Sequence, residues 1–299
     1  MNRLFVMFML SIFNLLLDNK FMSEQTKQPY VGVSGIISPE IQASVEEIAN
    51  TVGLHEKGRL LALGVKAVHK TQFLDIENKY GTEWYPVGKE AFTRVLRHDN
   101  QSPNTIAVAQ AYLDVEHVDS EEYRKAFLKR IVERGQPWLQ AIQFDMLPWN
   151  KNYQTLEFLE KVKDHGVEVF LQAHKSAMEE LGPDGVVRRL GHYAHLIDYL
   201  LFDSSHGTGK RLDTSALRPF VAAAYEKLNL SQTGIALAGG LNGAVVREDL
   251  PKLVAQYPDL SWDAEGQLHP TNQDGKRPLD LSVTEDYLRA SSEILITTQ

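Results

Sequence analysis

A chain of 299 residues with 43% hydrophobic and 23% charged residues has the composition of an ordinary folded protein, long enough for one α/β barrel or for two average domains. Its formal net charge of −8, with acidic and basic residues interspersed, argues against nucleic acid or an anionic membrane surface as a partner. The absence of cysteine excludes disulfides, thiolate metal sites and a cysteine nucleophile.

The first segment, Met1–Leu17, is apolar behind Arg3 and resembles the beginning of a secretory signal. It is too short to span a bilayer comfortably, and the following Asp18–Phe21 offers no small-x-small cleavage site. Met22 then begins a segment typical of a cytoplasmic start. We favour an extended start, with Met22 as the true first residue of a cytoplasmic protein; an uncleaved membrane anchor is the alternative.

From Tyr30 onward, short apolar runs alternate with amphipathic helical stretches, as in repeated βα units around a parallel sheet. Eight strands are predicted, at Tyr30–Ser34, Leu60–Val68, Thr105–Tyr112, Leu139–Asp145, Glu168–His174, Tyr199–Asp203, Gly234–Ala238 and Leu260–Asp263. Helices between them are predicted at Pro39–Thr51, Ser120–Arg134, Tyr153–His165, Thr214–Leu228, Val246–Gln256 and Val283–Ile294, among others. Eight units favour a closed (βα)₈ barrel over an open doubly wound sheet. We therefore predict one barrel domain over residues 29–299, with residues 1–28 as an extension outside it.

Two long stretches between these elements are predicted to be irregular, His69–Pro86 and Gln267–Leu281. Both follow strands, where a barrel keeps its functional loops. Lys66, His69 and Lys70 near the first of them either attract a substrate anion or belong to an exposed basic loop.

The sixth strand ends in a carboxylate, Asp203, and a Gly-Thr-Gly-Lys loop follows it. Strand alternation places Asp203 on the same side as Leu201, so its side chain should project at the mouth of the barrel. Partial burial there raises a carboxyl pKa and suits a general acid or base; a loop cap that accepts backbone N–H bonds is the equally ordinary alternative. Gly207, Gly209 and Lys210 form a weak phosphate signal, because their spacing is not that of a P-loop.

The seventh strand runs directly into Gly239 and Gly240. Paired glycines let backbone N–H groups approach an anion closely, and barrels often bind phosphate after strands seven and eight. A tight turn that needs positive φ is the commoner use of such a pair. The position in the seventh unit favours a phosphate site, to which we also assign Asn242 and Gly266.

These two motifs resemble those of the phosphoribosylanthranilate isomerase family. The run from Leu200 to Asp213 is similar to the strand-six aspartate and Gly-Thr-Gly-Lys-x-Phe-Asp loop of that family, with Leu212 in place of Phe, and Leu237–Asn242 is similar to its seventh-strand motif. Weaker matches follow the family in order at Val33–Ile36, Ala141–Phe144, Leu171–Ala173 and Asp263 with Gly266. The resemblance covers Tyr30–Ile294. It implies a ribulose-phosphate-binding barrel that catalyses an Amadori-type isomerisation.

The chain also departs from that family. The family uses a cysteine base at the end of strand one and an aspartate acid on strand six; Asp203 matches the acid, but Ser34 stands at the cysteine position and a hydroxyl is too weak a base. The arginine that binds the anthranilate carboxylate has no match in Gly81–Pro86. In the eighth loop, Glu265 would repel a phosphate dianion unless it points away. We therefore expect a changed substrate, and a chain that does not replace an authentic phosphoribosylanthranilate isomerase at normal rates.

Other polar residues offer a substitute for the missing cysteine. Alternation along the fourth strand turns Asp145 to the same side as Gln143, so Asp145 should share the mouth with Asp203. One interpretation is a carboxylate pair for acid/base catalysis. Together with His174, Asp263 and Glu265 at other strand ends, the carboxylates also suit a divalent metal, or simply form an ordinary polar barrel mouth.

The predicted catalytic set is Asp203 as the central reactive group, Asp145 as its neighbour and Ser34 as a hydrogen-bonding group. The predicted substrate- and phosphate-binding set is Gly207, Gly209, Lys210, Gly239, Gly240, Asn242, Asp263, Gly266, Gln143 and His174. The favoured function is isomerisation of a small phosphorylated sugar derivative by a monomer or homodimer, with no cofactor and no resident metal. The alternative is a non-catalytic or metal-dependent barrel that binds a small anionic ligand or a partner.

Overall fold

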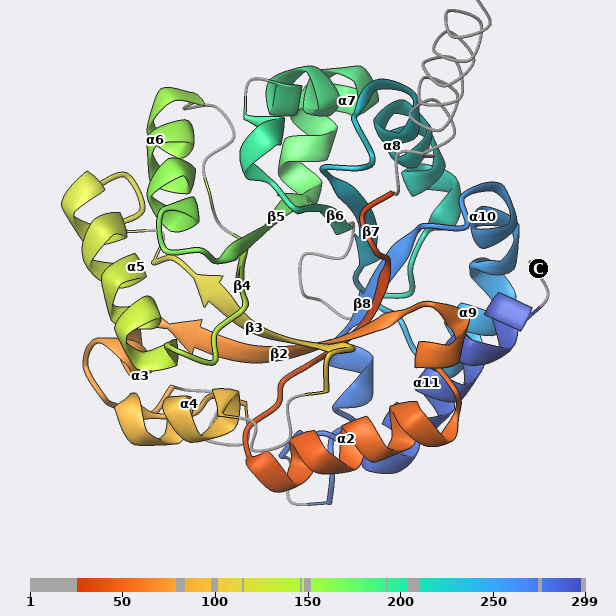
Figure 1. Ribbon diagram of the computed structural model, residues 1–299, viewed down its shortest axis with the longest axis horizontal. Coiled ribbons are helices and arrows are strands. Elements are labelled where there is room, and N and C mark those ends of the chain that lie inside the picture. The colour runs from red at the N-terminus through yellow and green to blue at the C-terminus, as the bar shows by residue number, and fades with distance from the viewer. Residues whose placement is uncertain are drawn as a thin grey trace, which may run out of the picture.

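Eight parallel strands close into a barrel in sequence order (Figure 1). They are β1 (Tyr30–Ser34), β2 (Leu60–Val68), β3 (Thr105–Tyr112), β4 (Ala141–Phe144), β5 (Glu168–His174), β6 (Tyr199–Asp203), β7 (Gly234–Ala238) and β8 (Ser261–Ala264). Each strand pairs in parallel with the next, and β8 closes the barrel on β1. The predicted single-domain (βα)₈ barrel is confirmed.

The computed structural model describes residues 26–78, 84–97, 102–114, 116–145, 147, 152–191, 193–203, 210–273 and 276–296. Both interpretations of the apolar segment Met1–Leu17 therefore lie outside the described residues. Contacts with the barrel already begin at Lys27, whose backbone N–H donates to the carbonyl of Leu230 over 2.7 Å. Within the described ranges, no helix has the length and apolar character needed to cross a membrane.

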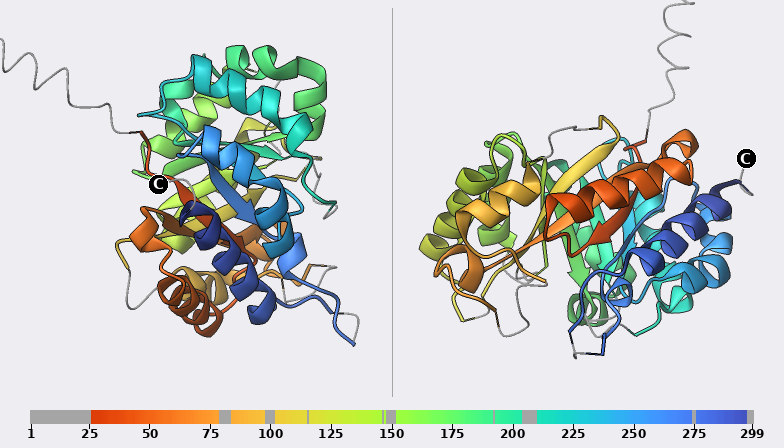
Figure 2. Two further views of the ribbon diagram at one scale, coloured as in Figure 1. Left: turned by 90° about the vertical axis from the view of Figure 1, so that its right-hand side faces the viewer. Right: turned by 90° about the horizontal axis from the view of Figure 1, so that it is seen from below.

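Helices surround the barrel on all sides (Figures 1 and 2). They are α2 (Pro39–Thr51), α3 (His69–Gln72), α4 (Gly88–Leu96), α5 (Glu121–Gly135), α6 (Asn152–Lys163), α7 (Lys175–Gly191), α8 (Thr214–Lys227), α9 (Gly243–Asp249), α10 (Pro251–Gln256) and α11 (Leu281–Ile296), with short 3₁₀ turns η1 (His55–Lys57), η2 (Ala194–Leu196) and η3 (Gly266–Leu268). Local sequence begins several of them: Ser38 caps α2 ahead of Pro39, and Ser120 caps α5.

Some predicted bounds were wrong. The single helix predicted over Val246–Gln256 is two helices, because Asn242 caps an earlier start at Gly243 and Pro251 begins α10. The strand predicted over Leu139–Asp145 is shorter, since only Ala141–Phe144 pairs with β3. The last strand is shifted by one residue, to Ser261–Ala264. The stretch predicted to be irregular after β2 contains α3, and the one after β8 contains most of η3.

The barrel interior is apolar at the amino ends of the strands and polar at their carboxyl ends. The apolar layer is one packed cluster of Tyr30, Ala62, Ile106, Val108, Ala141, Phe170, Tyr199, Leu201, Ala236 and Ala238. Because side chains alternate along a strand, the same face continues into polar residues further along. Those residues are Ser34, Lys66, Gln110, Tyr112, Gln143, Asp145, Gln172, His174, Asp203, Asp263 and Glu265. The fold thereby places a dense polar group at the end where barrels carry their active sites.

Candidate active site

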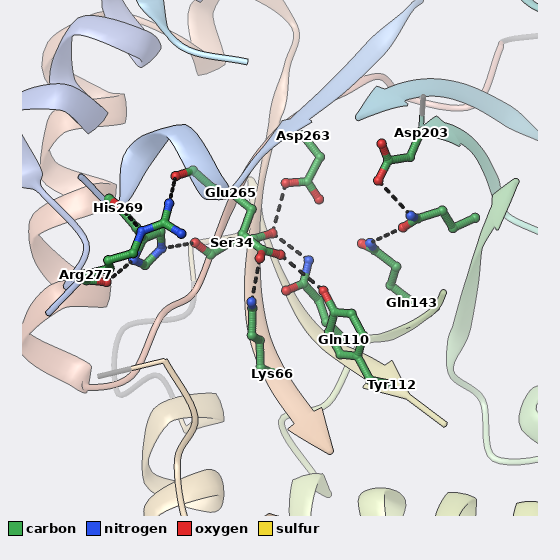
Figure 3. Close-up of polar contacts among 12 residues, drawn as sticks. Ser34, Lys66, Gln110, Tyr112, Gln143, Asp203, Asp263, Glu265, His269 and Arg277 are labelled. Carbon is green, nitrogen blue, oxygen red and sulfur yellow. Dashed lines mark hydrogen bonds and ion pairs between the residues drawn. The ribbon is translucent and has the colours of Figure 1, made fainter. Parts of the chain in front are cut away.

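Asp203, the last residue of β6, is buried and linked by hydrogen bonds to the two preceding strands (Figure 3). Its Oδ2 accepts from Gln172 Nε2 on β5 over 2.9 Å, and Gln172 Oε1 in turn accepts from Gln143 Nε2 on β4 over 3.4 Å. The predicted residues Gln143 and Asp203 are thus joined by Gln172, which the sequence motifs did not single out. This row of amides fixes the orientation of the Asp203 carboxyl group.

Asp145 directly follows β4 and is half-buried beside other carboxylates. Burial raises the pKa of Asp145 to about 7, and the negative charges of Asp203 and Glu265 add to the rise. The Lys66 ammonium opposes this rise only in part. A carboxyl group that exchanges its proton near neutral pH has the property that acid/base catalysis requires.

Ser34 lies between two buried side chains from other strands (Figure 3). Its hydroxyl donates to Asp263 Oδ1 over 2.9 Å and accepts from Gln110 Nε2 over 2.6 Å. Burial raises the pKa of Asp263 to about 7; the Ser34 hydrogen bond opposes the rise, while the charge of Glu265 adds to it. The structure therefore brings Ser34 against a carboxyl group, a pairing that the sequence motifs did not indicate.

Asp263→Asn is expected to stabilise the protein in alkaline solution. Aspartate in an unfolded chain has a pKa of about 3.9, whereas burial raises that of Asp263 to about 7 in the folded protein. Between these values the folded state binds more protons than the unfolded state, so the free energy of unfolding falls as pH rises through the folded pKa. Urea unfolding should show the wild type losing about 3 kcal/mol relative to Asp263→Asn between about pH 5 and about pH 8. A difference between the two proteins that stays constant with pH would contradict the raised pKa.

Lys66 and Glu265 form an ion pair inside the barrel, with Lys66 Nζ 2.5 Å from Glu265 Oε1. The Tyr112 hydroxyl donates to Glu265 Oε2 over 3.2 Å, and the Trp84 ring lies 4.0 Å from Lys66 Nζ. Burial alone would raise the pKa of Glu265, but the charge and hydrogen bond of Lys66, with smaller contributions from His269 and Tyr112, together outweigh it and hold this pKa below its ordinary value. Glu265 is thus neutralised within the protein, and Lys66 is occupied by it.

Loop residues close this corner of the mouth. The Trp84 ring stacks on His269 with their centroids 4.3 Å apart, and His269 Nε2 lies 3.0 Å from the carbonyl oxygen of Ser34. Arg277 donates to the carbonyl of Gly266 over 2.8 Å and lies over Trp84. Figure 2 shows the segment between β8 and α11, which carries His269 and Arg277, extending beyond the ends of the helices. The loops after β2 and β8 therefore pack together over β1.

The predicted phosphate-binding residues have different local roles. Gly239 and Gly240 adopt φ of 95° and 68°, as a tight turn requires. Gly240 also packs directly against the backbone of Lys210, where a side chain would collide, and the Lys210 side chain is exposed. Asn242 caps α9 by accepting from the backbone N–H of Val245 over 3.0 Å. Gly207 and Gly209 lie outside the described residues.

His174 also has a local structural role. Its Nδ1 accepts from the backbone N–H of Ala177 over 3.2 Å and lies 2.8 Å from Ser176 Oγ, at the start of α7. A neutral His174 therefore carries its proton on Nε2. Among the described residues, no group of three or more His, Asp or Glu side chains is arranged to hold a metal ion.

The chain folds as a (βα)₈ barrel. Solved structures of two enzymes are similar to it. The tryptophan synthase alpha chain from Legionella pneumophila subsp. pneumophila matches with a TM-score of 0.54 and 12% identity over 90% of this chain and 92% of its own. Triosephosphate isomerase from Bartonella henselae matches with a TM-score of 0.50 and 8% identity over 88% of this chain and 99% of its own. At these identities the likeness establishes the fold alone. No protein-family model and no curated protein sequence matches the chain.

Three polar residues of the mouth were missed from the sequence: Gln110, Tyr112 and Gln172. Each belongs to the inward face that alternation defines, so the signal was present in β3 and β5. Their importance comes from contacts across strands, with Ser34, Glu265 and Asp203 respectively. Such contacts depend on how neighbouring strands are offset, which the pattern of one strand does not specify.

Proposed function

We propose that this protein is an isomerase that moves a proton within a small phosphorylated sugar derivative, as a divergent relative of the phosphoribosylanthranilate isomerases. The observation that carries the proposal is the pair of carboxyl groups at the mouth, Asp203 and Asp145, whose charges interact so that the pKa of Asp145 is raised to about 7 by burial and by Asp203. Two nearby carboxyl groups in different environments supply one acid and one base. A purely structural polar layer has no need of such a pair.

For a glycosylamine, the substrate class that the resemblance implies, the two groups would act in sequence. The reaction starts from the state in which the proton of the pair is on Asp203 and Asp145 is ionised. Asp203 donates that proton to the ring oxygen as the bond from C1 to that oxygen breaks, with the nitrogen lone pair stabilising C1. Asp145 then takes the proton from C2, and the electrons of that bond form a C1–C2 double bond. Return of the proton from Asp145 to C1, and of the enol hydroxyl proton to Asp203, yields the ketone and restores both residues.

The backbone around Gly239 and Gly240 is our candidate for the phosphate, with Asn242 and Gly266 beside it. The positive φ at both glycines supports this assignment, because successive N–H groups in such turns converge on one point. Neutralisation of Glu265 by Lys66 removes the repulsion expected from the sequence. We further propose a cytoplasmic monomer or homodimer without a resident metal.

Solvent exchange tests the reaction itself. Phosphorylated aldoses and glycosylamines incubated with the protein in D₂O should gain deuterium on carbon, because the proton that Asp145 removes from C2 mixes with solvent before it is returned. Mass spectrometry of the recovered sugars measures this gain. Absence of deuterium from every sugar that binds the protein would reject the isomerase and favour a binding barrel.

Inorganic phosphate at millimolar concentration should shift the amide NMR signals of Gly239, Gly240, Asn242 and Gly266. The physical reason is that backbone N–H groups bound to an anion change their electronic environment. The amide of Gly166, in the turn between α6 and β5, provides an internal control. Unchanged signals at the four residues would remove the phosphate from the proposal.

A further inference from the structure

The amide, hydroxyl and ammonium groups of the polar layer already donate hydrogen bonds within the protein. The Gln143 and Gln172 amides donate to Gln172 and Asp203. On the other side of the mouth, Gln110 donates to Ser34, Ser34 to Asp263, and both Lys66 and Tyr112 to Glu265. Lys66 is also the single lysine or arginine in the eight described strands, and its ammonium group is already paired with Glu265.

Several hydrogen-bond acceptors of the polar layer, in contrast, can accept further hydrogen bonds. Gln110 Oε1 is buried without a hydrogen-bond partner among the described residues, although only 3% of Gln110 is exposed. Among the described residues, the side-chain hydrogen bond that Asp263 accepts comes from Ser34 and reaches Oδ1 (Figure 3). The Asp145 carboxyl group accepts no hydrogen bond from the part of the chain that the structure describes. Leaving a buried acceptor such as Gln110 Oε1 unpartnered costs stability, and the carboxyl groups of Asp145 and Asp263 in the same mouth can accept further hydrogen bonds. Together these groups fit a ligand that supplies donors.

Two glycines on the inward face of the barrel, Gly32 and Gly64, leave room for the polar side chains beside them. A Cβ on Gly32 would lie 2.8 Å from Asp263 Cγ, and one on Gly64 would lie 2.6 Å from Ser34 Oγ and 2.8 Å from Gln110 Cδ. Any other residue at Gly32 or Gly64 would push these polar side chains from their places. Glycine inside a strand lacks a side chain to pack and often marks a close approach. The acceptor group is therefore built into strands β1, β2, β3 and β8.

We propose that the mouth binds the hydroxyl- or amine-bearing end of a substrate that carries no carboxylate, with Gln110 Oε1, Asp145 and Asp263 as the acceptors. A ligand with several O–H or N–H groups satisfies them at once. A carboxylate at that end would meet Asp145, Asp203 and Asp263, while the ammonium group of Lys66 is already paired with Glu265. The inference deepens the proposed function, because it assumes that the ligand enters at the carboxyl ends of the strands.

Calorimetric titration with two matched probes tests this inference. Ribitol 5-phosphate and 5-phosphoribonate have the same carbon chain and phosphate, and differ in whether the far end is a hydroxymethyl group or a carboxylate. The polyol should bind at least tenfold more tightly, since one buried interaction lost commonly changes affinity by about that factor. Equal affinities, tighter binding of the phosphoribonate, or no binding of either probe would overturn the inference.

Matched variants test whether ribitol 5-phosphate binds to these acceptors. Gln110→Met should weaken the binding of ribitol 5-phosphate at least fivefold. Asp263→Asn keeps the size of the side chain and its contact with Ser34, and it should reduce the ratio by which the protein binds ribitol 5-phosphate more tightly than 5-phosphoribonate. Gln42→Met is the control, because Gln42 is also buried, with an unpartnered Oε1, but lies on helix α2 outside the barrel. Unchanged polyol affinity in Gln110→Met and an unchanged preference in Asp263→Asn would together overturn the assignment.

The inference and the proposed function can fail separately. Tight, selective binding of the polyol without deuterium exchange in any sugar would support the acceptor site and reject the isomerase. Deuterium exchange in a protein that prefers the phosphoribonate would support the isomerase and overturn the acceptor site.

Discussion

Asp203→Asn lowers the rate of solvent exchange into a sugar substrate by a factor of about 10²–10⁴, the usual loss when one proton-transfer group is removed. Asn has the same size, and its side-chain oxygen still accepts the hydrogen bond that Gln172 gives to Asp203 over 2.9 Å. The substitution therefore removes the proton while leaving the geometry of the site intact. The measurement is deuterium uptake by mass spectrometry, with urea unfolding to show that the variant is folded.

Two further variants compare how much Asp145 and Ser34 contribute to the exchange rate. Asp145→Asn should lower the exchange rate severely, because it removes the carboxyl whose pKa burial and Asp203 raise to about 7. Ser34→Ala should retain most of the rate, since the hydroxyl serves to hold Asp263 and has no proton-transfer role of its own in the proposed reaction. Exchange that survives Asp203→Asn, or that is lost in Ser34→Ala alone, would overturn these roles.

The barrel was predictable because its signals are local. Each strand is a short apolar run, and the helix boundaries depend on nearby caps such as Ser120, whose hydroxyl accepts from the backbone of Tyr123. The one clear error among the helices, a continuous Val246–Gln256, has a local cause, because α9 ends at Asp249 and Pro251 begins a new helix. The two-residue alternation of strands is also local, and it suffices to place Gln143 and Asp145 on the inward face of the barrel.

The partnerships within the site were not predictable in the same way. Asp263 on β8 is paired with Gly32 on β1, and Ser34 lies two residues further along β1 on the same inward face. The Asp263 side chain therefore reaches the Ser34 hydroxyl diagonally. That offset is set by closure of the whole barrel, and no single strand encodes it. The neutralisation of Glu265 by Lys66 similarly joins residues that are 199 positions apart. The sequence therefore indicated which residues share the mouth, whereas their hydrogen-bond partners depend on the three-dimensional offset of the strands.

Lys66→Met is expected to destabilise the protein by about 3 kcal/mol, because it leaves the partly buried carboxylate of Glu265 without its cation. The Lys66 side chain is 4% exposed and that of Glu265 28% exposed, so solvent compensates the loss poorly. Methionine retains most of the apolar stem that packs beside Trp84, which separates the effect of charge from that of volume. Urea unfolding at neutral pH measures the change.

A second substitution distinguishes the lost charge pair from a general disturbance of the barrel. Glu265→Gln added to Lys66→Met should restore most of the stability, because removing both charges leaves no buried ion to solvate. Arg94→Met offers the surface comparison: its partner Glu90 is 87% exposed, and breaking that pair should cost less than about 0.5 kcal/mol. If the double variant is no more stable than Lys66→Met alone, the ion pair is not what holds this corner of the mouth together, and the packing of Trp84 on His269 would have to explain the loss.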